Sequence, residues 1–192
     1  MPTILITGAS GFIGQLLATH LLTNHATAPE NKLILTDIIT PSAPSSPHPQ
    51  NIQCIQADLC NAESLSSLLS SAGTIDTIFI STGIMSFRVG AKFRARHERI
   101  RNTPSLKPEG KLVRVIYASS LAVYGRPLPE IITRETHPTP EGSYGCQKLA
   151  CETLLQDYIA GDYRWFGIAF PTIVSGPGKP TQAGEFVSER DD

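Results

Sequence analysis

The sequence predicts a single α/β domain with a Rossmann-type, doubly wound parallel sheet. A β-branched run at residues 3–7 leads through three closely spaced glycines into an apolar stripe with helical spacing, which describes a strand, a turn and a helix. Further along the chain, short apolar runs alternate with helical stripes, a pattern typical of parallel sheets with right-handed crossovers. A chain of 192 residues is long enough to bury one such core.

The first unit predicts a dinucleotide site. Its glycines turn the chain between the strand and a helix expected over residues 12–24. Backbone N–H groups at a helix N-terminus point at bound phosphates, and the helix dipole favours negative charge, so a pyrophosphate is the expected ligand. The residues expected to contact it are Gly8, Gly11, Phe12, Ile13 and Gly14.

The second apolar run, residues 32–37, ends on a carboxylate. Asp37 follows the glycines at roughly the 20-residue spacing at which an acidic residue meets the adenosine ribose in dinucleotide folds. A carboxylate there accepts hydrogen bonds from the 2′-OH and repels a 2′-phosphate, so it favours NAD over NADP. The alternative is an aspartate that merely ends a strand.

The middle of the chain continues the alternation. The proline- and serine-rich residues 40–51 predict an exposed loop without a packing role. Residues 51–56 alternate as a strand does, and Asn61 is placed to cap a helix with a leucine-rich face. A fourth strand is expected over residues 76–80, and the segment after it meets the cofactor in this architecture, with Thr82 as the expected contact.

The pattern fails in the arginine-rich segment 87–106. A crossover helix is expected there, but the segment has no helical apolar stripe. A nucleic-acid or phosphate patch would need interleaved aromatic residues, which are few, so we expect no nucleic-acid partner. A solvated insert and a stretch read in a shifted frame are the alternatives. Without that helix, one face of the fourth and fifth strands is uncovered, and this predicts association into homo-oligomers.

The later elements bring reactive side chains to one edge. A fifth strand over 111–118 delivers Ser119 and Ser120 at its carboxyl end, where ligands bind in open α/β sheets. Tyr144 and Lys148 lie four residues apart on the following helix and share a face. A nearby ammonium lowers the pKa of a phenol, so Tyr144 is the expected base during hydride transfer, and Ser120 holds the substrate oxygen. A surface Tyr–Lys pair and a capping serine are the alternatives.

These motifs resemble the extended short-chain dehydrogenase/reductase family, the NAD-dependent epimerases and dehydratases. The matching residues are 7–14, 37, 58–59, 117–125, 143–148 and 171–174. The resemblance implies that Ser120 rather than Ser119 is catalytic. It also implies cofactor contacts from a further set of residues, namely Asp58, Leu59, Tyr144, Lys148, Pro171 and Ile173.

Within the family, residues 82–86, 139–145 and 171–180 resemble enzymes that use NAD to oxidise the C2 hydroxyl of a small sugar acid such as D-erythronate. The family continues past the last strand into a substrate-binding lobe. We therefore expect an NAD-binding domain over 1–180 and a truncated start of that lobe over 181–192. A catalytically defective NAD-binding fragment or regulatory module, and a nucleotide-sugar epimerase or dehydratase, remain the alternatives.

Composition narrows the class of protein further. Sixteen basic and 17 acidic residues give a net charge of −1, which attracts neither nucleic acid nor an anionic membrane. No apolar run reaches the roughly 18 residues of a membrane span, and no signal-peptide layout is present, so a cytoplasmic protein without a membrane partner is expected. The four cysteines lack metal-ligand spacing, so no metal is expected.

Overall fold

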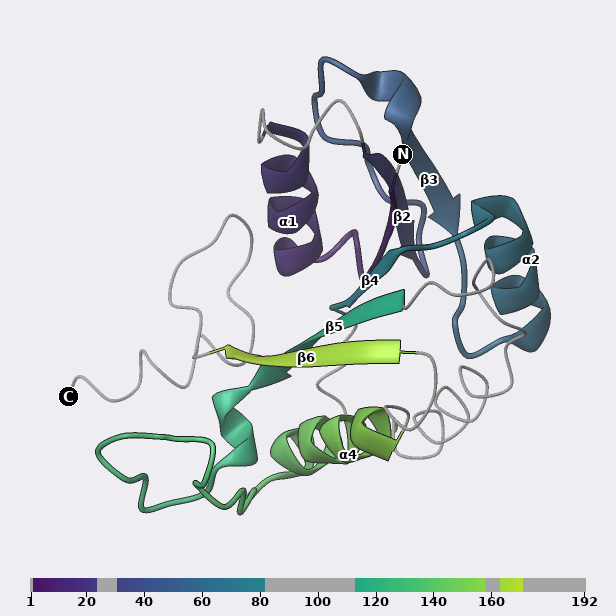
Figure 1. Ribbon diagram of the computed structural model, residues 1–192. Helices are drawn as coiled ribbons and strands as arrows, with labels where there is room; N and C mark the ends of the chain where they lie inside the picture. The colour runs from purple at the N-terminus through teal and green to yellow at the C-terminus, as the bar shows by residue number, and fades with distance from the viewer. Residues whose placement is uncertain (1, 24–30, 82–112, 158–162, 171–192) are drawn as a thin grey trace.

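The computed structural model describes residues 2–23, 31–81, 113–157 and 163–170. These residues form a six-stranded parallel sheet with the strand order β3-β2-β1-β4-β5-β6 (Figure 1). The order reverses between β1 and β4, which makes this the doubly wound, Rossmann-type sheet that the sequence predicts. The strands are β1 (Thr3–Thr7), β2 (Lys32–Asp37), β3 (Ile52–Gln56), β4 (Thr77–Ile80), β5 (Val113–Ser120) and β6 (Tyr163–Phe170).

The central strand β1 explains why the chain begins with an uninterrupted apolar run. It pairs with β2 on one side and with β4 on the other, and all five of its residues are buried. A parallel strand covered on both faces has no solvent side, so its side chains do not alternate between polar and apolar. Ile6 of this strand is completely buried.

Helices cover both faces of the sheet. α1 (Phe12–Thr23) packs on one face, and α2 (Ala62–Ala72) packs on the opposite face (Figure 1). α4 (Ser143–Asp157) lies on the same side as α2, because Ile78 of β4 packs against the core clusters of both helices. The sheet therefore separates α1 from α4.

The predicted cap of α2 is confirmed. The Asn61 side chain accepts hydrogen bonds from the backbone N–H groups of Glu63 at 2.9 Å and Ser64 at 3.1 Å. It thus satisfies two of the N–H groups that a helix start leaves without partners. The helix ends at Gly73, whose φ of +72° favours glycine.

The loop over residues 40–51 differs from its prediction. Pro41 is buried, and the Gln15 side-chain amide donates to the Ser42 carbonyl at 3.2 Å. A short 3-10 turn, η2 (Pro49–Asn51), then leads into β3. The loop is therefore held against α1, because proline excludes regular helix and strand but still offers an apolar ring for packing.

Several predicted features lie outside the described residues. They are the arginine-rich segment 87–106, the division of the chain near residue 180, and the predicted cofactor contacts Thr82, Pro171 and Ile173. Within the described ranges, none of the helices has both the length and the apolar character of a membrane span. The same ranges hold no group of three or more His, Cys, Asp or Glu residues placed to bind a metal.

Candidate active site

The glycine turn lies at the carboxyl end of β1. Gly8 has a φ of +70°, in the left-handed region that favours glycine. A Cβ on Gly14 would lie 2.3 Å from the Gly8 carbonyl oxygen and 2.6 Å from the Cα of Ala9. The start of α1 can approach the turn this closely only because Gly14 has no side chain.

Two observations indicate that this turn fits a dinucleotide phosphate. The first turn of α1 contains no acidic residue, so its N–H groups and helix dipole favour an anion. The Ser10 hydroxyl oxygen is buried and has no hydrogen-bond partner among the described residues. A buried hydroxyl without a partner costs free energy, and a phosphate oxygen is an acceptor that would satisfy it. Phe12 and Ile13 follow directly, at the beginning of the helix.

Asp37 connects this turn to the end of β2. One of its carboxylate oxygens accepts a hydrogen bond from the Ser10 N–H at 3.0 Å, and the other accepts one from the Ile38 N–H at 2.7 Å. Each oxygen of a carboxylate has two lone-pair sites. The side chain therefore retains the capacity to accept hydrogen bonds from ribose hydroxyls.

Asp58 and Leu59 lie next to Asp37, after the neighbouring strand β3. The Ala57 N–H donates to the Asp37 carbonyl at 2.8 Å, which holds the two strand ends together. Asp58 is exposed and accepts from the Cys60 N–H at 2.8 Å, while Leu59 is partly buried against the α2 core. The two predicted adenine contacts thus lie on the β2–β3 side of the glycine turn.

The end of β4 is joined to β1 on the other side of the turn. The Ser81 hydroxyl donates to the Thr7 carbonyl at 2.5 Å, and the Ser81 N–H donates to the same oxygen at 3.3 Å. This is the point where the strand order reverses, and in open α/β sheets the crevice at such a point binds the ligand.

The three predicted catalytic side chains come together at the carboxyl end of β5. The Ser120 side chain lies near enough to Tyr144 to lower the pKa of its phenol, and the Ser120 oxygen accepts a hydrogen bond from the Ala122 N–H at 3.2 Å, which caps the 3-10 turn η4 (Leu121–Val123). The Lys148 ammonium lies 5.6 Å from the centre of the Tyr144 ring. Ser120 is therefore a capping residue and a partner of Tyr144 at once.

Lys148 is held below the surface. It is 7% exposed, and its Nζ donates to the Ala118 carbonyl at 2.6 Å. The same atom lies 5.0 Å from the centre of the Tyr117 ring, within the range of a cation–π contact. Burial lowers the pKa of Lys148, and negative charge at Cys151 and Glu152 opposes this shift.

The expectation that Lys148 lowers the pKa of Tyr144 is wrong for the chain alone. Burial raises the pKa of Tyr144, and the neighbouring Ser120 side chain opposes this shift. The physical reason is that Lys148 directs its ammonium to the Ala118 carbonyl. Of the two causes, only the one from Ser120 lowers the pKa of Tyr144.

Sequence reasoning missed Glu152. Its carboxylate accepts a hydrogen bond from the Ser119 hydroxyl, next to the predicted catalytic serine. The available signal was its spacing, because a carboxylate four residues after Lys148 lies on the same helical face.

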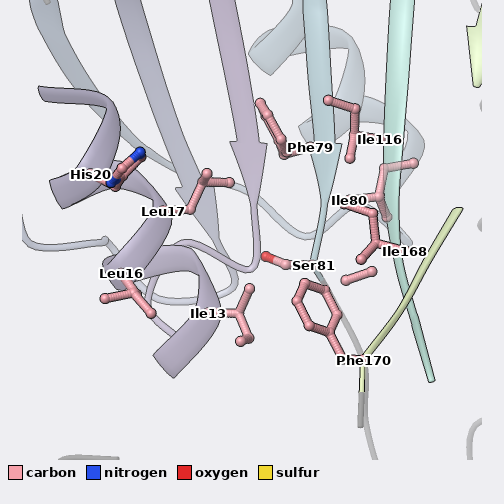
Figure 2. A pocket seen from close by; sticks show the side chains of 11 residues that line it. Ile13, Leu16, Leu17, His20, Phe79, Ile80, Ser81, Ile116, Ile168 and Phe170 are labelled. Atoms are coloured by element: carbon pink, nitrogen blue, oxygen red, sulfur yellow. The ribbon is translucent and has the colours of Figure 1, made fainter. Parts of the chain in front are cut away.

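A cavity of about 390 Å³ lies on the other face of the sheet (Figure 2). Its walls are mostly apolar and come from α1, β4, β5 and β6, including Ile13, Leu17, Phe79, Ile116 and Phe170. Ser120, Tyr144 and Lys148 do not line it. The cavity adjoins the glycine turn through Ile13, but the proposed proton-transfer groups lie elsewhere.

The chain is similar to known proteins in sequence and in fold. D-erythronate dehydrogenase from Haemophilus influenzae is 34% identical over 96% of this chain, and the enzyme of that name from Cupriavidus necator is 31% identical over 94%. A nucleoside-diphosphate-sugar epimerase from Agrobacterium tumefaciens superposes on 95% of the chain with a TM-score of 0.73 and 34% identity. The chain spans 59%, 58% and 56% of these three proteins, respectively.

A model of one family matches almost the whole sequence. The match covers residues 4–189, and therefore includes the glycine turn, Asp37 and the Ser120–Tyr144–Lys148 group. The match assigns the chain to a family, and the parallel sheet agrees with it. The chain belongs to the NAD dependent epimerase/dehydratase family.

Proposed function

We propose that the protein is an NAD-dependent oxidoreductase that removes a hydride from the C2 hydroxyl carbon of a small sugar acid of the D-erythronate type. The observation that supports it most is that Ser120, Tyr144 and Lys148 lie together at the same sheet edge as the glycine turn. The two D-erythronate dehydrogenases support the substrate class.

In this proposal, different residues of the chain bind different parts of NAD. Bound NAD would supply the hydride acceptor, its nicotinamide ring. The turn from Gly8 to Gly14 binds the pyrophosphate, Asp37 accepts from the adenosine ribose, and Asp58 with Leu59 contacts the adenine. A carboxylate at position 37 also repels a 2′-phosphate, so the site prefers NAD to NADP.

In this proposal, Ser120 and Tyr144 act on the substrate hydroxyl and remove its proton. Ser120 donates a hydrogen bond to the substrate oxygen and orients it, and Tyr144, as phenolate, takes the hydroxyl proton. The C–H bond breaks and its electron pair leaves with the hydride, while the carbon–oxygen double bond forms. In this proposal Lys148 contacts the nicotinamide ribose, and the positive charge of bound NAD favours the phenolate.

A direct test combines two measurements on the purified chain. NAD binding is measured by calorimetric titration, and NADH formation is followed by absorbance with D-erythronate as the substrate. Binding together with reduction supports the proposal. Binding without reduction supports a cofactor-binding module instead, and turnover of a nucleotide sugar supports an epimerase or dehydratase.

Asp37→Asn is expected to weaken NAD binding by about tenfold, because a charged acceptor of ribose hydrogen bonds becomes a neutral one. The affinity for NADP should fall less, since the repulsion of its 2′-phosphate is also removed. Calorimetric titration with both cofactors measures the two changes.

Asp76→Asn is the matched control for this change. Asp76 also accepts a backbone hydrogen bond, from the Thr3 N–H at 2.8 Å, but at the opposite edge of the sheet. Its substitution should leave both cofactor affinities unchanged. Equal losses of NAD and NADP affinity in Asp37→Asn would argue against ribose recognition by Asp37.

We further propose that the chain associates through the apolar surface beside α1. Phe166 and Ile168 on β6 are 56% and 46% exposed, and by strand alternation they share a face with Phe170 of the cavity wall. The wild type should therefore be at least dimeric in light scattering, and a Phe166→Ser/Ile168→Ser variant should shift toward monomer. A monomeric wild type would contradict this.

A further inference from the structure

The peptide group between Ala9 and Ser10, in the glycine turn, is held at both of its polar ends. Its oxygen accepts a hydrogen bond from the Gln15 side-chain amide at 2.6 Å, and its N–H donates to the Asp37 carboxylate at 3.0 Å. This peptide bond is trans, so the group is planar and its oxygen and N–H point to opposite sides. Fixing the oxygen therefore also fixes the direction of the N–H to which Asp37 is bonded.

The Gln15 amide is itself anchored by the loop over residues 40–51. Its nitrogen also donates to the Ser42 carbonyl at 3.2 Å, and the neighbouring Pro41 is buried. An amide nitrogen carries two N–H donors, so it can serve both carbonyls at once. The bond to Ser42 restricts the rotation of the Gln15 side chain, which is thus held toward the turn.

Burial makes the bond to Gln15 important for the turn. Ala9 is 0% exposed, and its own N–H donates to the Thr36 carbonyl of β2 at 3.1 Å. A buried carbonyl that loses its donor costs free energy, so the turn without Gln15 gains by rotating the peptide group toward water. That rotation would also turn the Ser10 N–H away from Asp37.

We propose that Gln15 is a positioning residue for cofactor recognition. By holding the Ala9 carbonyl, it fixes the Ser10 N–H and, through it, the carboxylate of Asp37 at the ribose of NAD. This inference rests on the role proposed above for Asp37. Gln15 acts through the peptide group and not by contact with the ribose.

The test is the ratio of two affinities, measured by calorimetric titration with NAD and with NADP. Gln15→Met keeps a side chain of similar length and removes both donors. The Kd of NAD should rise about fivefold, the effect of one neutral hydrogen bond, because the carboxylate is less often in position. The Kd of NADP should change by less than about twofold, since a displaced carboxylate also repels the 2′-phosphate less.

The ratio separates positioning from a purely structural role. A residue that only stabilised the fold would lower the melting temperature and leave the preference for NAD over NADP unchanged. Gln15→Ala removes the same donors by shortening the side chain, and it should shift the ratio in the same direction. Circular dichroism confirms that each variant is folded at the temperature of the titration. An unchanged ratio in both variants overturns the proposal.

Gln56→Met is the matched control. Gln56 also donates a side-chain N–H to a carbonyl after β2, that of Ile38 at 2.9 Å, and its other side-chain bond is to Thr40. These bonds hold the segment after Asp37 without involving the peptide group of the turn, so the ratio should stay at the wild-type value. An equal shift in Gln56→Met would show that this segment orients Asp37, and would overturn the role of Gln15.

Comparison with Asp37→Asn separates this proposal from the one on which it rests. If Asp37→Asn shifts the ratio and the Gln15 variants do not, recognition by Asp37 stands and the role of Gln15 fails. If neither shifts it, both fail. In the Asp37→Asn background, Gln15→Met should add little to the shift, and a full further shift there would refute action through Asp37. Both affinities are measured without substrate, so a lack of turnover would count only against the proposed reaction.

Discussion

Replacing Tyr144 with phenylalanine should lower kcat for NADH formation by about 10³-fold, within the range by which general bases contribute to catalysis. The substitution removes one oxygen and keeps the half-buried ring, so α4 retains its packing. Without the hydroxyl, the substrate proton has no acceptor beside Ser120. The affinity for NAD should change by less than about twofold, since the glycine turn and Asp37 carry that affinity in the proposal. Assays of NADH formation measure kcat, and calorimetric titration measures the affinity for NAD.

Tyr124→Phe is the control for the loss of a phenol near this site. Tyr124 follows η4 and is partly buried, as Tyr144 is, and its N–H donates to the Leu121 carbonyl at 3.0 Å. Its hydroxyl has no place in the proposed proton transfer, so kcat should be close to that of the wild type. A Tyr144→Phe variant that keeps a tenth or more of the wild-type kcat would remove Tyr144 from the role of base.

The elements that the sequence predicts well are those specified by neighbouring residues. The strand, glycine turn and helix around Gly14 follow from a local pattern, because the close approach of Gly14 to Gly8 involves residues only six apart. Asn61 was placed as a helix cap for the same reason: a cap bonds to N–H groups two and three residues ahead. Sequence spacing also placed Tyr144 and Lys148 on one helical face.

The features that the sequence did not predict depend on packing between distant segments. Whether Lys148 points its ammonium at Tyr144 or at Ala118 is decided by how α4 docks on β5, 30 residues away in the chain. The burial that raises the pKa of Tyr144 arises from the same docking. Glu152 was overlooked because its partner, Ser119, lies 33 residues away in the chain. Sequence spacing thus predicts which face of a helix a residue occupies, but not which atoms its side chain contacts.

The docking of α4 makes Gly145 the most sensitive backbone position near the site. A Cβ at this position would lie 2.0 Å from the Ala122 carbonyl oxygen and 2.9 Å from its carbon. Both atoms belong to the backbone of η4, so no side chain can rotate to make room. Gly145→Ala must therefore push α4 away from η4, which moves Tyr144 away from Ser120.

Gly145→Ala is expected to destabilise the protein by about 1–3 kcal/mol, the usual range for overpacking a buried site, and to abolish NADH formation even at temperatures where the variant is folded. Thermal unfolding followed by circular dichroism measures the first effect, and the NADH assay measures the second. Gly142→Ala is the matched control, because a Cβ at Gly142 has no atom within 4 Å. That variant should be as stable as the wild type or slightly more stable, since alanine restricts the unfolded chain. If both variants unfold at the wild-type temperature, the close contact between α4 and η4 does not position Tyr144.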